Sequence, residues 1–213
     1  PMEGLGHGIR FRDLHFAYGE NEILRGIDLE VRPGEVIAFV GRTGTGKSTL
    51  ARALADRLRA GGAGVTILDK DVVRGALFGP SEIEYSTRQD DFCVEVMLQA
   101  AEYILRKDPD KNVILDGRTF SRRCQVDRVR MFARKLGVPC GWIECACSDE
   151  TVRQRLERDA AEGRHPASNR TYAMYLSVKA RAEPVEGPKL VVDTDGDLER
   201  CVRCCLQYIQ EGE

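Results

Sequence analysis

The chain has 213 residues, of which 42% are hydrophobic and 31% are charged, and its formal net charge is -2. This length and apolar content suit one domain with one core better than two domains. A nearly balanced charge gives no overall attraction for a polyanion, so nucleic acid is an unlikely partner and a small molecule is the expected one. No apolar run could cross a bilayer and no signal-peptide pattern opens the chain, so we expect a cytoplasmic protein with no membrane partner.

Two stretches near the N-terminus alternate apolar and polar residues, which is the pattern of half-buried strands. They cover residues 9–18 and 23–31, and a turn at residues 19–22 joins them. Residues 32–34, Arg-Pro-Gly, are typical of a further turn. We therefore expect residues 1–34 to add an antiparallel strand pair to a single domain that spans residues 1–213.

A glycine-rich loop lies between a short, mainly apolar strand, residues 35–40, and a helical segment that follows it. The loop matches the pattern G-x-x-x-x-G-K-[ST], whose backbone N–H groups and helix N-terminus bind phosphate oxygens. Lys47 would reach the terminal phosphates, and Ser48 would bind Mg²⁺. ATP and Mg²⁺ are therefore the predicted cofactors. The predicted nucleotide-binding residues of this segment are Gly41, Arg42, Thr43, Gly44, Thr45, Gly46, Lys47, Ser48 and Thr49.

Beyond this loop, apolar strands alternate with amphipathic helices as far as the C-terminus. The alternation predicts an α/β fold, a P-loop NTPase three-layer sandwich with a mostly parallel sheet, whose ligands gather at the carboxyl ends of the strands. The predicted strands after the loop are residues 65–68, 113–116, 138–145 and 190–193. The predicted helices are residues 91–106, 122–136, 149–161, 169–182 and 198–209.

The segments Phe16–Tyr18, Ile23–Leu29, Pro33–Glu35 and Gly46–Leu50 resemble the opening of ABC-transporter ATPases. This resemblance implies that Tyr18 stacks on adenine, although an aromatic core residue at a strand end is an equal alternative. The resemblance stops at the helix after the loop. No Ser-Gly-Gly signature follows, and Asp116 is followed by glycine instead of the glutamate that a transport ATPase needs.

Two later segments, Leu68–Leu77 and Val113–Arg123, resemble small-molecule kinases of the adenylylsulfate kinase, polynucleotide kinase and zeta-toxin group. The first is close to the adenylylsulfate kinase run Leu-Asp-Gly-Asp-Asn-x-Arg-x-Gly-Leu. The order of elements agrees from about residue 36 to 210, and residues 35–213 are the expected kinase core. The resemblance implies transfer of the γ-phosphoryl group of ATP to a hydroxyl group of a small, anionic acceptor.

Such a transfer needs a carboxylate beside the acceptor hydroxyl, which orients it and accepts its proton. We assign this role to Asp71, and we expect Asp69 to hold a Mg²⁺-bound water or to share the role. Either carboxylate could instead cap the following helix. Arg74 would hold an anionic group of the acceptor, unless it lies on a solvated helix face.

Asp116 ends an apolar strand where a Walker B carboxylate would bond to Ser48 or to a water on Mg²⁺. The predicted metal-binding residues are therefore Ser48, Asp69 and Asp116. Asp116 and two residues after it, Arg118 and Arg122, are also predicted to meet the acceptor. The alternative for the arginines is an ordinary basic helix face.

A lid is expected at about residues 155–170, where arginines would fold over the phosphates and exclude water. We assign catalytic roles to Arg155, Arg158 and Arg164. Helical spacing separates Arg153 from this group. For each arginine, a surface ion pair with a neighbouring glutamate or aspartate is the alternative.

Two other functions remain open. The chain could be a nucleic-acid end kinase, because Arg118, Arg122, Arg123, Arg128 and Arg130 supply a local basic surface. It could also be a non-catalytic, nucleotide-responsive binding module, whose N-terminal strands dock a partner or form a homodimer. The eight cysteines are expected to be reduced residues of the core, with a structural zinc site as the alternative.

Overall fold

The structure is a computed structural model, and it describes residues 9–18, 21–31, 34–162 and 171–211. Its centre is a five-stranded sheet with the strand order β4-β5-β3-β6-β7, in which every neighbouring pair is parallel. The strands are β3 (Val36–Val40), β4 (Val65–Asp69), β5 (Asn112–Asp116), β6 (Cys140–Ala146) and β7 (Leu190–Asp193). The predicted α/β class and parallel sheet are therefore confirmed.

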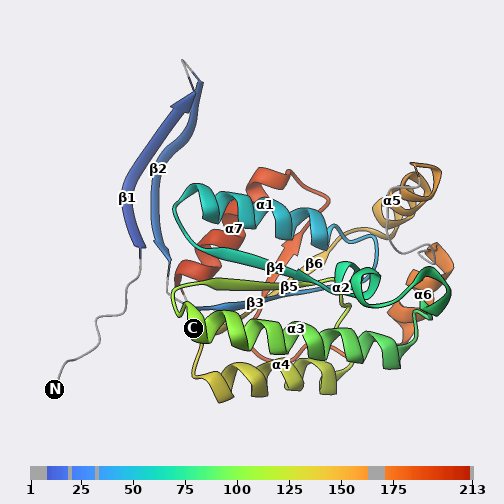
Figure 1. Cartoon of the computed structure of the whole chain (residues 1–213). Helices are drawn as coiled ribbons and strands as arrows, with labels where there is room; N and C mark the ends of the chain where they lie inside the picture. The colour runs from blue at the N-terminus through green and yellow to red at the C-terminus, as the bar shows by residue number, and fades with distance from the viewer. Residues whose placement is uncertain (1–8, 19–20, 32–33, 163–170, 212–213) are drawn as a thin grey trace.

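Helices cover both faces of this sheet (Figure 1). One face packs against α1 (Lys47–Ala60) and α7 (Leu198–Glu211), and the other packs against α3 (Thr87–Lys107) and α4 (Arg123–Leu136). The remaining helices, α2 (Lys70–Leu77), the 3₁₀ turn η1 (Pro80–Glu82), α5 (Asp149–Glu162) and α6 (Tyr172–Arg181), gather near the carboxyl ends of the strands. The result is the three-layer sandwich that the sequence predicts.

The central strand β3 explains why the sheet needs cover on both sides. All five of its residues are buried, and successive side chains point to opposite faces. Ile37 and Phe39 join the apolar cluster under α1 and α7, whereas Val36, Ala38 and Val40 join the cluster under α3 and α4. A strand that is apolar at every position is typical of a parallel sheet buried on both faces.

The N-terminal strands form a separate two-stranded sheet. β1 (Ile9–Tyr18) and β2 (Asn21–Val31) pair antiparallel from Ile9 opposite Val31 to Tyr18 opposite Asn21. The ribbon stands to one side of the five-stranded sheet (Figure 1). The expected extra strand pair is present, and its second strand begins two residues earlier than the sequence suggests. The side chain of Tyr18, to which we assigned adenine stacking, lies outside the described part of the chain.

Capping side chains explain why two helices, α3 and α6, begin at residues other than those that the apolar pattern predicts. α3 begins four residues earlier than expected because the hydroxyl oxygen of Ser86 accepts a hydrogen bond of 3.1 Å from the backbone N–H of Gln89. α6 begins after Thr171, whose hydroxyl oxygen accepts from the N–H of Met174. Across the described ranges, no helix combines the length and apolar character that a membrane crossing needs.

The cysteines behave as small apolar residues. Cys93, Cys145, Cys201 and Cys205 are buried, whereas Cys124 and Cys204 are exposed. Burial raises the pKa of the Cys145 thiol to about 12. In the part of the chain that the structure describes, no three or more His, Cys, Asp or Glu side chains gather where they could hold a metal ion.

The packing of α1 on the sheet gives a first prediction. Leu54 is completely buried in the cluster under α1 and α7, so Leu54→Ala should lower the free energy of unfolding by about 3 kcal/mol because it leaves a cavity. Urea denaturation would measure this loss. The control is Met131→Ala, since Met131 is 63% exposed on α4 and should change stability by less than about 0.5 kcal/mol. Equal losses in the two variants would contradict the described core.

The cysteine environments give a second prediction. At pH 8 in the folded protein, a thiol-specific dye should label the exposed Cys124 and Cys204 rapidly and the four buried cysteines slowly. The buried thiols are inaccessible to the dye, and burial also keeps them protonated. Mass spectrometry of labelled peptides would identify the sites. Unfolding in urea should expose all eight cysteines. Rapid labelling of Cys145 in the folded chain would show that β6 is not packed as described.

Candidate nucleotide and acceptor site

The candidate site lies where three parallel strands end. β3 leads into the glycine-rich loop, while β4 ends at Asp69 and β5 ends at Asp116. The strand register places Asp69 directly beside Asp116. Because parallel strands end at one edge of their sheet, the loop and the two carboxylates meet there.

The glycine-rich loop has a shape that only glycines allow. Gly41 and Gly44 have φ angles of 137° and 79°, and a Cβ atom on Gly41 would lie 2.7 Å from the carbonyl oxygen of Cys145. The Lys47 ammonium donates a hydrogen bond of 2.8 Å to the carbonyl oxygen of Arg42. The side chain of Lys47 thus curls back over the loop, as expected of a P-loop lysine.

Three cavities open on this loop among the described residues, and two of them, with volumes of about 310 and 420 Å³, share part of their lining. Three residues, Lys47, Ser48 and Asp71, line both of them. The larger cavity, which we call the nucleotide cavity, is also lined by loop residues Gly44 and Gly46 and by Thr49. The smaller one, which we call the acceptor cavity, is also lined by Thr43 and by charged side chains of α2, α3 and the segment after β5. Asp71 therefore comes together with six predicted loop residues, Thr43, Gly44, Gly46, Lys47, Ser48 and Thr49. The other three, Gly41, Arg42 and Thr45, line a third cavity of about 290 Å³.

Asp69 caps the helix that follows it. Its Oδ1 atom accepts hydrogen bonds from the backbone N–H groups of Asp71, at 2.8 Å, and Val72, at 3.4 Å. The capping role that the sequence left open is thus real, and Asp69 still lines the nucleotide cavity. Burial, and next the negative charge of Asp116, raise the pKa of the Asp69 carboxyl.

Asp116 is 1% exposed, and its Oδ1 atom has no hydrogen-bond partner among the described residues. A buried carboxylate oxygen without a donor is costly, so it points to a ligand that would satisfy it. Ser48, Asp69 and Asp116 offer the hard oxygen ligands that Mg²⁺ prefers, and waters and phosphate oxygens commonly complete its shell. The residues therefore fit a magnesium ion.

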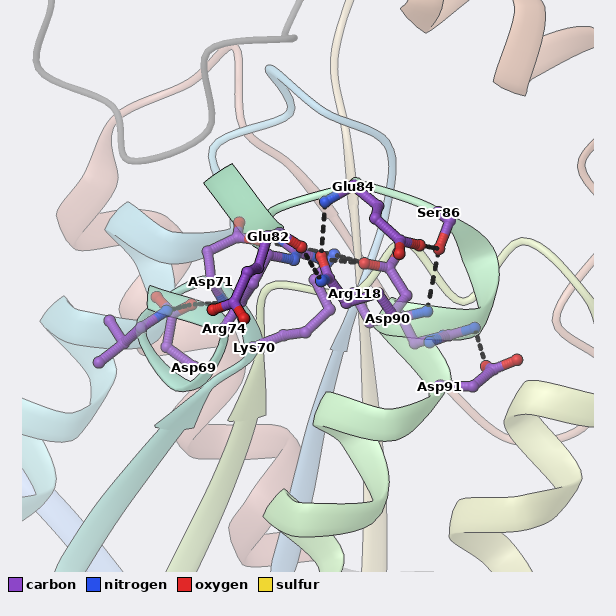
Figure 2. Close-up of polar contacts among 12 residues, drawn as sticks. Asp69, Lys70, Asp71, Arg74, Glu82, Glu84, Ser86, Asp90, Asp91 and Arg118 are labelled. Atoms are coloured by element: carbon purple, nitrogen blue, oxygen red, sulfur yellow. Dashed lines mark hydrogen bonds and ion pairs between the residues drawn. The ribbon is translucent and has the colours of Figure 1, made fainter. Parts of the chain in front are cut away.

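Arg74 is not on a solvated helix face, and that alternative is wrong. Its side chain is 2% exposed and pairs with two carboxylates, Asp71 at 2.5 Å and Asp90. Lys70 approaches the same two carboxylates, at 2.8 Å from Asp90 and 3.5 Å from Asp71. The guanidinium of Arg74 also lies 5.1 Å from the ring centroid of Tyr85. Figure 2 shows Lys70, Asp71, Arg74 and Asp90 as one charged cluster.

Arg118 and Arg122 both line the acceptor cavity. Arg118 is 4% exposed and donates a hydrogen bond of 2.5 Å to Asp91, while its Nη1 atom is buried without a partner among the described residues. Arg122 is exposed and is the residue that precedes α4. The other arginines of the basic surface are paired elsewhere: Arg123 with Glu186, Arg128 with Glu95, and Arg130 with the backbone of Glu186.

The two described lid arginines, Arg155 and Arg158, line the nucleotide cavity. Arg155 donates a hydrogen bond of 2.7 Å to the carbonyl oxygen of Thr194, whose hydroxyl donates to the carbonyl oxygen of Thr45 at 2.9 Å. Arg155 is thereby tied to the P-loop. Arg153 pairs with Glu150, away from the site as expected. Arg164 lies outside the described residues.

Several site residues were missed by the sequence reasoning. Asp90 and Asp91 each bind a basic residue of the acceptor cavity, and Lys70 and Arg181 contribute further positive charge to its walls. The only sequence signal was that Asp90 and Asp91 lie near the start of an amphipathic helix. Such acidic residues are ordinarily explained by the helix dipole.

Known proteins that resemble this chain in sequence include P-loop ATP-binding proteins, in agreement with the glycine-rich loop described above. Residues 36–184 match a family model described as an AAA domain, AAA_33. The N-terminal part matches ABC-type proteins: an aliphatic sulfonates import ATP-binding protein of Nocardia farcinica is 51% identical over 53 residues, 25% of this chain and 22% of that protein. A phosphate import ATP-binding protein of Salinibacter ruber is 54% identical over 46 residues, 22% of this chain and 18% of that protein. The chain thus spans about a fifth of these relatives.

Solved structures match over most of the chain. A kinase-like protein from Chloroflexus aurantiacus is 25% identical, with a TM-score of 0.64 over 83% of this chain and 98% of that one. An APS kinase from Mycobacterium tuberculosis, in complex with AMPPNP and APS, is 17% identical, with a TM-score of 0.65 over 84% and 99%. A gluconokinase from Sinorhizobium meliloti is 16% identical, with a TM-score of 0.59 over 84% and 93%. The chain belongs to the AAA_33 family of AAA domains and has a P-loop, nucleotide-binding, kinase-like fold.

Proposed function

We propose that the protein is an ATP-dependent phosphotransferase that moves the γ-phosphoryl group to a hydroxyl group of a small, anionic metabolite. The observation that carries the proposal is that Lys47, Ser48 and Asp71 line both cavities. A phosphoryl group held by Lys47 would therefore face Asp71 across the opening between nucleotide and acceptor. Phosphoryl transfer depends mainly on this kind of alignment and on positive charge around the oxygens.

On the nucleotide side, the loop N–H groups and Lys47 would bind the phosphates. Ser48, Asp69 and Asp116 would hold a Mg²⁺ ion, directly or through water, and the bound ion would supply positive charge to the phosphates. Arg155 and Arg158, which line the same cavity, would cover the phosphates and limit the access of water. We propose the same role for Arg164.

On the acceptor side, Asp71 would orient the hydroxyl group and accept its proton as the new P–O bond forms. Arg74 fixes the Asp71 carboxylate, because the two side chains pair at 2.5 Å inside the wall of the cavity. Positive side chains elsewhere in that wall, Arg118 and Arg122, suit an anionic acceptor. The APS kinase and gluconokinase among the structural neighbours support this choice of reaction.

A nucleic-acid end kinase gains no support from the described surface. Arg123, Arg128 and Arg130 have acidic or backbone partners within the chain, so the basic face is largely neutralised. A small acceptor therefore remains our proposal. A homodimer through the N-terminal strands also stays a proposal.

The role of Asp71 gives a direct test. Asp71→Asn should keep the affinity for ATP within about twofold but lower kcat for transfer by about 100-fold or more, because the amide cannot accept the hydroxyl proton. ADP release with adenylylsulfate, gluconate and a 5′-hydroxyl oligonucleotide as acceptors would measure the rates. Asp56→Asn, a substitution on the exposed face of α1, is the control. Transfer by Asp71→Asn at the wild-type rate would remove Asp71 from its role.

The role of Lys47 is separable from that of Asp71. Lys47→Ala should weaken binding of an ATP analogue by about 10-fold or more and should also abolish transfer, because it removes the charge that faces the terminal phosphates. Titration calorimetry with the analogue and Mg²⁺ would measure the binding. Unchanged affinity in this variant would refute the placement of the triphosphate. Normal nucleotide binding by the wild-type protein with no transfer to any acceptor would favour a binding module.

A further inference from the structure

The charged cluster beside the acceptor cavity contains two cations and two carboxylates. Lys70, Asp71 and Arg74 come from α2, and Asp90 comes from α3 (Figure 2). The Oδ1 atom of Asp90 accepts bonds from both Lys70 and Arg74. The Oδ1 atom of Asp71 accepts a second bond from Arg74. Each positive charge in this wall of the cavity is therefore matched by a negative one.

Asp90 is held firmly where it makes these contacts. The side chain of the neighbouring Gln89 is buried and bonds in both directions to the segment before α3, donating to the carbonyl oxygen of Glu82 and accepting from the N–H of Glu84. Ser86 caps the same turn. Arg74 is 2% exposed, so its guanidinium cannot turn away into solvent. The pairing is thus fixed from both sides.

A second group of basic residues in the lining of the acceptor cavity has a different charge balance. It consists of Arg118, Arg122 and Arg181, and among the carboxylates of the described residues only Asp91 is paired with one of them, Arg118. The Nη1 atom of Arg118 and the Nε atom of Arg74 are each buried without a described partner, so the charge balance is what separates the two groups. Three arginines with one paired carboxylate leave a net positive charge, which suits an anionic group of a ligand.

We propose that Asp90 is a positioning residue that withdraws Lys70 and Arg74 from anion binding, so that the anionic group of the acceptor binds at Arg118, Arg122 and Arg181. The acceptor is thereby oriented. Its anionic end lies against these three arginines, and its hydroxyl end lies at Asp71. The inference deepens the proposed function by assigning the acceptor class: a molecule with a hydroxyl group and an anionic group at opposite ends, small enough for a cavity of about 310 Å³.

This assignment also changes the role of Arg74. The sequence resemblance gives it a bond to the acceptor, whereas the structure makes it a support for Asp71. Removing Asp90 would leave an uncompensated positive charge at Lys70 and Arg74, and that charge would attract a second anion. The expected result is a gain of anion binding, which a purely structural role of Asp90 would not produce.

Inorganic sulfate is the probe for the test. The full chain is first saturated with Mg²⁺ and a nonhydrolysable ATP analogue, so that the P-loop is filled, and sulfate binding is then measured by calorimetry. Asp90→Asn should bind sulfate about 5- to 10-fold more tightly than the wild type, because one negative charge has been removed beside two cations. Asp90→Glu, which keeps the charge, should bind like the wild type.

The matched control is Glu95→Gln, which removes one negative charge from the same helix where Glu95 pairs with Arg128 on the surface. It should leave sulfate affinity unchanged. If Asp90→Asn does not fold by circular dichroism, Asp90→Ala replaces it with the same expectation. In crystals soaked with sulfate, the anion should lie at Arg118 in the wild type and also at Lys70 and Arg74 in Asp90→Asn.

Two results would overturn the inference: sulfate bound between Lys70 and Arg74 in the wild type, or equal sulfate affinities in Asp90→Asn and Glu95→Gln. The measurement needs no transfer reaction. A failure to phosphorylate any acceptor would therefore count against the proposed function alone, while sulfate binding decides the role of Asp90.

Discussion

The register of three parallel strands is the constraint on which the site depends. β3 delivers the P-loop to the carboxyl edge of the sheet, and the pairing of β4 with β5 brings Asp69 beside Asp116 at the same edge. A shift of one residue in either strand would turn these carboxylates toward the other face of the sheet. The buried apolar side chains of β3 and β5 hold the register, since both strands are covered by helices on each face. Core packing thus fixes where the charged groups stand.

The charged cluster illustrates how such a site remains compatible with folding. Burying Arg74 alone would be very unfavourable, because an ion loses its hydration. Pairing it with Asp71 and Asp90 offsets that cost without adding much stability, since buried ion pairs roughly balance their desolvation. The effect of the ion pairs is to fix the orientation of the Asp71 carboxylate. An Asp71 carboxylate that is held by a buried guanidinium has few ways to turn away from the opening between the two cavities.

Much of the fold could be predicted because its signals are local. The P-loop pattern, the apolar strand before it and the alternation of strands and helices all lie within short windows of sequence. The cap by Asp69 was also foreseeable, as an aspartate directly before a helix. The burial of Arg74 in an ion pair could not be foreseen, because its partner Asp90 lies 16 residues away on another helix. The bonds of Arg118 to Asp91 and of Arg155 to Thr194 span 27 and 39 residues. Such contacts depend on the position and orientation in which each helix packs on the sheet, and no local sequence pattern specifies these.

The central claim is that a transferring phosphoryl group lies between Lys47 and Asp71. A crystal structure of the full chain with Mg²⁺, ADP and aluminium fluoride, which imitates that group, would test it most directly. We predict that the fluoride group contacts Lys47 and that an Asp71 carboxylate oxygen lies within about 4 Å of its open side. An Asp71 carboxylate more than about 7 Å away, or one on the ADP side of the group, would contradict the account.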